Sequence, residues 1–216
     1  MGVWQKLVSL NFDPNIFEVV NNTVTIKDEG ISLSKLSVDT FPLDMIAGFP
    51  NARCWYENGY YVVRVIKASG SVIELFTLRR RFGPGKYEAY GKAPASAFDG
   101  YNTLYLFGFE RHPGWADEGI IYFKYGGGSY NVKTAWDGNS TLTDIGTQDW
   151  TVDRKFTIDW TLSKVDFYID DSLIASHTTN IPQGPMALFI EAMSPTNATA
   201  DAIVYGLKDF KILAIY

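Results

Sequence analysis

Short segments of alternating apolar and polar residues run through this chain, and no segment has the signals that begin and end a long helix. Alternation with a period of two residues is typical of a half-buried strand, and clusters of Gly, Pro, Asn, Asp and Ser separate the segments. Residues 40–50 and the polar stretch 137–149 are predicted as loops. Strands are predicted over residues 3–12, 17–26, 31–36, 60–68, 72–81, 86–92, 103–109, 119–125, 130–136, 150–161, 181–193 and 200–216, with a hairpin inside 156–176.

Strands of even spacing without an internal repeat predict an all-β protein, a two-sheet antiparallel β-sandwich. With 216 residues, 46% of them hydrophobic, the chain is large enough for one good core. All-β domains of this length are often single, so we expect one domain over residues 1–216.

Composition excludes some classes of function. The net charge of −5 argues against nucleic acid as the main partner. No apolar segment is long enough to span a membrane, and residues 1–12 do not have the pattern of a signal peptide. The one cysteine, Cys54, excludes an internal disulfide, and we interpret it as a small buried apolar residue. The compartment, with an extracellular location among the alternatives, and the oligomeric state are left open.

One stretch, RFGPGKYEAYGKAP followed by an aromatic strand and the loop RHPGWAD, resembles the family 16 glycoside hydrolases of the β-glucanase and laminarinase group. The segments FTIDWTLSKVDFYIDD and PMALFIEAM resemble later parts of that family. The resemblance covers about residues 60–216. It implies a concanavalin-like jelly roll whose concave sheet holds a glycan, with strand 119–125 central in that sheet.

The family's catalytic strand, Glu-x-Asp-x-Glu, has no full counterpart here. The resemblance places Glu118 on the first carboxylate, Ile120 on the aspartate and Tyr122 on the second glutamate. These three side chains share a face because strand side chains alternate. A phenol with a pKa near ~10 does not replace the family's carboxyl acid, so the resemblance implies an altered catalytic strand.

A second carboxylate for hydrolysis is available on a different strand. Glu191, in the segment FIEAM, belongs to a strand that the resemblance places beside the cleft, where it would form a pair with Glu118. A retaining glycosidase needs two carboxyl groups ~5–5.5 Å apart. The alternative is an ion pair between Glu191 and a nearby Lys or Arg.

Aromatic side chains around the expected cleft favour binding, because flat rings pack against the apolar faces of sugars. The alternative is that these rings fill the core of an aromatic-rich sandwich. Glu110 lies before the loop and is a candidate for the rim of the cleft. The candidate binding residues are Trp115, Tyr122, Tyr101, Trp55, Tyr56 and Glu110.

Two further resemblances are weaker. YFKYGGGSY resembles a motif of the family 7 alginate lyases, but neither His112 nor His177 follows the Gln-Ile pair of those enzymes. Concanavalin-like sheets often hold a structural calcium ion, and Asp201 matches the position of a ligand. No zinc spacing, phosphate loop or serine triad is present, and no cofactor is expected.

These observations predict a protein that binds an oligo- or polysaccharide in a cleft on one sheet. The first alternative is a β-glucanase-like glycoside hydrolase that uses Glu118 with Glu191. The second is a structural or adhesive sandwich without a ligand. The number of carboxylates in the cleft distinguishes binding from hydrolysis.

Overall fold

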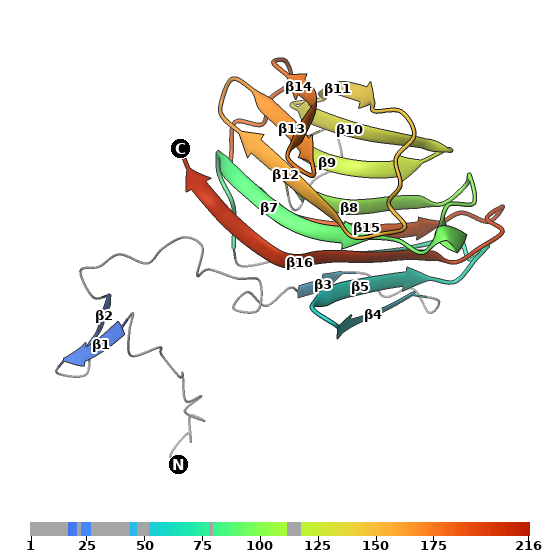
Figure 1. Cartoon of the computed structure of the whole chain (residues 1–216), viewed down its shortest axis with the longest axis horizontal. Helices are drawn as coiled ribbons and strands as arrows, with labels where there is room; N and C mark the ends of the chain where they lie inside the picture. The colour runs from blue at the N-terminus through green and yellow to red at the C-terminus, as the bar shows by residue number, and fades with distance from the viewer. Residues whose placement is uncertain (1–16, 21–22, 27–43, 47–51, 78–79, 112–117) are drawn as a thin grey trace, which may run out of the picture.

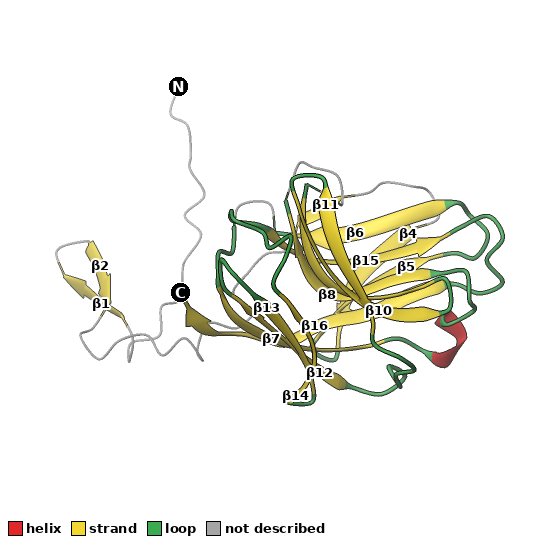
Figure 2. Ribbon diagram, turned by 90° about the horizontal axis from the view of Figure 1, so that it is seen from above, coloured by secondary structure: helices red, strands yellow, loops and turns green. Residues whose placement is uncertain are grey.

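The computed structural model describes residues 17–20, 23–26, 44–46, 52–77, 80–111 and 118–216. They form two seven-stranded antiparallel sheets that pack face to face as a sandwich, and a separate two-stranded hairpin (Figure 1 and Figure 2). The hairpin pairs β1 (Phe17–Val20) with β2 (Thr23–Ile26). The all-β class and the antiparallel jelly-roll sandwich predicted from the sequence are confirmed.

The first sheet, called here the β9 sheet, has the order β11-β10-β9-β8-β15-β6-β3. Strand β9 lies inside this sheet, between β10 and β8, as predicted for residues 119–125. The strands are Asn139–Asp144 (β11), Ser129–Trp136 (β10), Gly119–Gly126 (β9), Thr103–Glu110 (β8), Ala187–Ser194 (β15), Ser71–Phe76 (β6) and Asp44–Ile46 (β3).

The second sheet, called the β7 sheet, has the order β14-β13-β12-β7-β16-β5-β4. Its longest strand is β16, which pairs with β7 on one side and β5 on the other. The strands are Ser172–His177 (β14), Val165–Ile169 (β13), Arg154–Trp160 (β12), Gly85–Lys92 (β7), Ala202–Ile215 (β16), Tyr60–Val65 (β5) and Ala52–Glu57 (β4).

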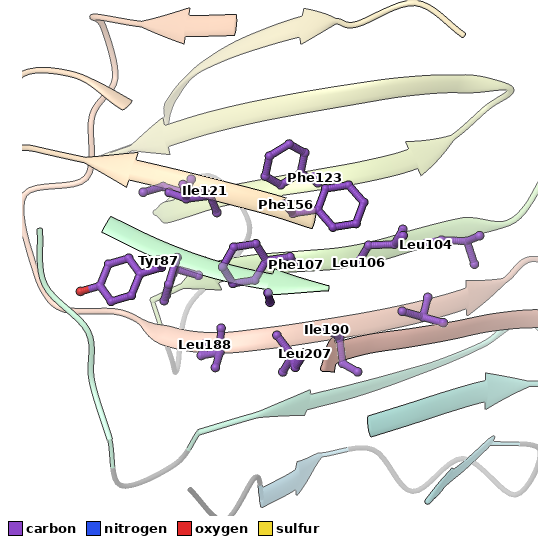
Figure 3. Packing of buried hydrophobic residues seen from close by; sticks show 14 of the residues in the cluster. Tyr87, Leu104, Leu106, Phe107, Ile121, Phe123, Phe156, Leu188, Ile190 and Leu207 are labelled. Carbon is purple, nitrogen blue, oxygen red and sulfur yellow. The ribbon is translucent and has the colours of Figure 1, made fainter. Parts of the chain in front are cut away.

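Aromatic side chains fill the space between the two sheets. The ring of Phe123 on β9 lies 4.8 Å from that of Phe156 and 5.4 Å from that of Phe167, both on the β7 sheet. Figure 3 shows side chains of both sheets in this space, among them Phe123 of β9 and Phe156 of the opposite sheet. Because strand side chains alternate, each strand of the β9 sheet that buries such residues turns its other side chains outward.

A buried histidine joins the sheets at their edges. The Nδ1 atom of His177 on β14 is 2.9 Å from Oγ1 of Thr134 on β10, and Nε2 is 2.9 Å from Oγ1 of Thr143 on β11. Burial lowers the pKa of this imidazole. Both ring nitrogens therefore have hydroxyl partners, so the neutral ring is satisfied where it is buried.

Some predicted elements differ from the observed ones. Strands β4 and β11 were not predicted, β3 lies in the segment predicted as a loop, and the strand predicted over 150–161 begins at Arg154. In β11 only every second residue is partly buried, so the apolar pattern is weak. The predicted strands 3–12 and 31–36 lie outside the described residues. The only helical element among the described residues is the 3-10 turn Ala95–Ala97, and it is too short to cross a membrane. That the whole chain is one domain stays a prediction.

The inward packing of Phe123 can be tested by truncation. Phe123→Ala should lower the free energy of unfolding by about 3–5 kcal/mol, because the change leaves a cavity between the sheets. Leu142→Ala is the control, since Leu142 on β11 is 58% exposed, and it should change the stability by less than about 0.5 kcal/mol. Urea unfolding curves measure both, and equal effects would contradict the packing.

Candidate functional site

The outward face of the β9 sheet carries a group of ionisable side chains, called here the carboxylate face. Its members come from five neighbouring strands, β6, β15, β8, β9 and β10, and the pairing register sets them side by side. Glu191 on β15 lies directly opposite Glu74 on β6 and Tyr105 on β8, and Tyr105 lies opposite Lys124 on β9. The carboxylate face consists of Glu74, Glu110, Glu191, Tyr105, Tyr122, Lys124 and Lys133.

Packed rings form the floor beneath these polar groups. Tyr105 and Tyr122 meet edge to face at 4.8 Å, and Tyr105 lies 5.6 Å from Phe189. Gly108 lies between Tyr122 and Phe189 in the register, and a Cβ there would come within 2.7 Å of the Phe189 ring. The glycine is therefore needed for the rings to close over β8. This cluster is separate from the core between the sheets.

The carboxyl groups of Glu74, Glu110 and Glu191 interact with one another. The carboxyl groups of Glu74 and Glu110 are hydrogen bonded to each other. Two carboxylates repel, so such a bond requires a proton shared between them. Burial, and then the charge of Glu191, raise the pKa of Glu74 to about 7.

The pKa of Glu191 is raised further above its usual value than the pKa of Glu74. Burial, followed by the charge of Glu110, raises the pKa of Glu191 to about 8, and Lys124 opposes this shift. Near neutral pH, Glu191 is therefore mainly a neutral carboxylic acid, which can donate a proton. The shared proton leaves negative charge on the Glu74 and Glu110 pair. The face thus combines an acid with a carboxylate.

Lys124 and Tyr105 complete this row. The Nζ atom of Lys124 is 5.5 Å from the centre of the Tyr105 ring, a cation–π contact. Burial, and then the charge of Lys133, lower the pKa of Lys124. Burial raises the pKa of Tyr105, and the nearby glutamates add to the effect, so its phenol stays protonated and can donate a hydrogen bond.

The structure does not bring Glu118 and Glu191 together. Glu118 is exposed and comes just before β9, whereas Glu191 is in the row of Lys124, six residues further along that strand. Six residues of strand span about 20 Å. The pairing of these two carboxyl groups expected for hydrolysis is therefore not observed.

Of the other predicted residues, two lie on the carboxylate face and two lie on the other sheet. Glu110 is part of the face and belongs to its carboxyl cluster. Tyr122 is on the face too, but it is only 3% exposed, so its ring supports Tyr105 and has little surface left for a sugar. Trp55 and Tyr56 are on β4, the edge strand of the β7 sheet, so they do not line this face.

Tyr101 is half exposed in the loop before β8, beyond the row of Tyr105 and Glu191. Its backbone N–H donates to the Asp99 carboxylate in an Asx turn. The role predicted for Trp115 lies outside the described residues.

Asp201 does not fit a calcium site. One carboxylate oxygen accepts hydrogen bonds from the Arg64 guanidinium, and the other accepts from the backbone N–H of Lys67 at 2.9 Å. A guanidinium at bonding distance repels a divalent cation, which would need six to eight oxygens. In the described part of the chain, no three His, Cys, Asp or Glu side chains gather to hold a metal ion.

Glu74, Tyr105 and Lys124 were not predicted as site residues. Glu74 interrupts the apolar run VIELF, and an acid in such a run is a usable signal for a functional position. Its partner Glu191 is 117 positions further along the chain. The neighbouring positions of these two acids therefore depend on the strand order, which the sequence pattern does not supply.

No family model and no curated protein matches this sequence. Solved structures do match. The laminarinase catalytic domain of Thermotoga petrophila has a TM-score of 0.56 at 17% identity, over 76% of this chain and 79% of that one. The Bacillus licheniformis β-glucanase has 0.55 at 17%, over 79% and 91%. The transglycosylase Crh5 has 0.59 at 19%, over 84% and 82%. The chain therefore has a concanavalin-like jelly roll of the family 16 glycoside hydrolase type.

The raised pKa values of the acids predict a stability that falls with pH. A carboxyl group with a raised folded-state pKa is protonated in the folded chain but ionised in the unfolded chain between pH ~4.5 and its folded value. The folded state then binds more protons, so the free energy of unfolding decreases through the pKa values of about 7 and about 8. Glu191→Gln should flatten this decrease and stabilise the protein at pH 8.5 by about 1–3 kcal/mol.

The measurement is chemical unfolding at pH 5.5, 7 and 8.5. Glu118→Gln is the control, because the side chain of Glu118 is exposed, and it should follow the wild-type profile. A Glu191→Gln profile parallel to the wild type would show that the Glu191 carboxyl is not buried as described.

Proposed function

We propose that the carboxylate face binds a glycan chain. The observation that carries the proposal is the gathering of three carboxyl groups, a phenol and two ammonium groups on adjacent strands of one sheet face. Sugar hydroxyls both donate and accept hydrogen bonds, so a face with donors and acceptors side by side suits them. The solved structures of the same fold are named as glucanases and a transglycosylase, which supports a glycan as the ligand class.

The residues of β9 support binding of a glycan without the catalytic carboxylates of the family. Ile120 and Tyr122 occupy the positions where the resemblance would place two of the three catalytic carboxylates. Ile120 is 1% exposed and packs in the ring cluster under the face. Apart from Lys124, strand β9 therefore supplies apolar support, and the carboxyl groups come from β6, β8 and β15.

This proposal predicts that removal of single polar atoms weakens binding. Tyr105→Phe deletes one hydroxyl and keeps the ring packing, and it should weaken oligosaccharide binding about five- to tenfold. Glu74→Gln should have an effect of similar size, whereas Glu118→Gln should bind like the wild type. Titration calorimetry with β-1,3-glucan, mixed-linkage β-glucan and galactan oligosaccharides tests this. Failure of all three to bind, or equal binding by Tyr105→Phe, would leave the structural role as the better interpretation.

Cleavage of the glycan is a second candidate, favoured by the different environments of the acids. Glu191, neutral near pH 7, would protonate the glycosidic oxygen as the bond from that oxygen to the anomeric carbon breaks. The charged member of the Glu74 and Glu110 pair would attack the anomeric carbon or take a proton from an attacking water. This set of acids replaces the expected pair of Glu118 and Glu191.

If the face cleaves glycans, Glu191→Gln should lower the rate of reducing-end release by at least about 100-fold, because the general acid is lost. The wild-type rate should fall above the Glu191 pKa of about 8, since the acid form disappears. Glu118→Gln should keep the full rate. A reducing-sugar assay on the oligosaccharides that bind measures all three. Binding without release by the wild type would rule out cleavage and keep the binding proposal.

A further inference from the structure

An open cavity of about 450 Å³ lies at one end of the sandwich, and no residue of the carboxylate face is in its described lining. It lies between the β10–β11 hairpin, the turn that joins β12 to β13, and the segment that follows β14. Its volume is within the range of about 300–1,000 Å³ that is typical of small-molecule sites. We call it the end cavity, and we propose that it is a second site, which binds one neutral sugar residue.

An indole ring forms one wall of the end cavity. Trp136 is the last residue of β10, and its ring packs closely against two glycines. A Cβ on Gly119 would lie 3.0 Å from the ring, and one on Gly184 would lie 3.3 Å from it. The guanidinium of Arg111 is 5.4 Å from the ring centre. A ring held in this way offers a flat apolar surface at low entropic cost, as the C–H face of a pyranose requires.

Oriented acceptors surround the ring. The Gln183 amide nitrogen donates to the carbonyl oxygens of Leu162 and Ile181, at 2.9 and 2.8 Å, so its own oxygen remains as an acceptor. The Asn180 amide nitrogen donates to Oγ1 of Thr141 at 3.0 Å, so the Asn180 amide oxygen also remains as an acceptor. These bonds fix the amide orientations before a ligand arrives, and such preorganisation favours binding.

Asp137 supplies the charged acceptor. Its carboxylate makes no hydrogen bond or ion pair with the described part of the chain, although it lines the cavity. Sugar hydroxyls are donors that carboxylate and amide oxygens accept well. The described lining contains this one acid and no Lys or Arg. The electrostatics therefore favour a neutral sugar and disfavour a uronic acid or a sulfated sugar.

Two substitutions test the site with little risk to the fold. Asp137 has a φ of 52° and precedes Gly138, also at positive φ, in a two-residue hairpin turn. Asn-Gly is a preferred pair in such turns, so Asp137→Asn removes the charge and keeps the backbone. Asn180 has a φ of 56°, which glycine adopts freely, so Asn180→Gly deletes only the side chain. Asp209→Asn is the matched control, since Asp209 is exposed with a φ of 51° and does not line the cavity.

Saturation-transfer NMR and calorimetry would be run with glucose, galactose, N-acetylglucosamine and their β-linked trisaccharides, with glucuronic acid as the anionic comparison. At least one neutral sugar should bind. Asp137→Asn and Asn180→Gly should each weaken it about tenfold, while Asp209→Asn should leave it unchanged. Glucuronic acid should bind more weakly than glucose.

Variants of the carboxylate face separate the two proposals. Glu191→Gln and Tyr105→Phe should leave binding at the end cavity unchanged, because neither residue lines it. The end-cavity proposal is overturned if no neutral sugar binds, if Asp137→Asn and Asn180→Gly bind like the control, or if only the carboxylate-face variants lose binding. Loss of binding in the cavity variants alone would overturn the carboxylate-face proposal instead.

Discussion

The alternation of side chains along the strands of the β9 sheet is the constraint on which both the core and the candidate site depend. On β15, Leu188, Ile190 and Ala192 point into the core between the sheets, so Glu191 must point outward. The contact of Phe123 with the rings of the β7 sheet fixes β9 in the same way. A slip of one residue would exchange core and face on a strand, so the inter-sheet packing sets which polar groups reach the carboxylate face.

The carboxylate face is a destabilising arrangement that the rest of the sandwich supports. Glu74 lies opposite Glu191 in the register, where like charges disfavour the strand pairing. The molecule reduces this repulsion by protonation, as the pKa values of about 7 and about 8 indicate. Lys124 provides partial compensation. Perturbed acids of this kind are concentrated at functional sites, where stability is exchanged for reactivity or recognition.

Sequence patterns predicted the fold well because the buried strands have regular alternation and clear turn residues. Strand β11 was missed, since its partly buried residues, Thr141 and Thr143, are polar. Glu110 and Glu191 could be selected as acids of the expected cleft, but their partner Glu74 could not, because it is adjacent only through the strand order. Trp55 and Tyr56 were expected in loops or on the face around the cleft, whereas pairing with β5 puts them on the other sheet.

The side chains of the two proposed sites point in different directions and have different chemistry, so the two sites are independent. Lys133 and Trp136 belong to the same strand, but they have opposite parity, so Lys133 lies on the carboxylate face and Trp136 turns toward the end of the sandwich. The face combines proton donors with buried negative charge, and its affinity should depend on pH. The end cavity relies on a flat ring with amide and carboxylate acceptors, and the buried carboxyl groups of the face do not line it. A ligand that binds equally at pH 6 and pH 9 would therefore belong to the end cavity.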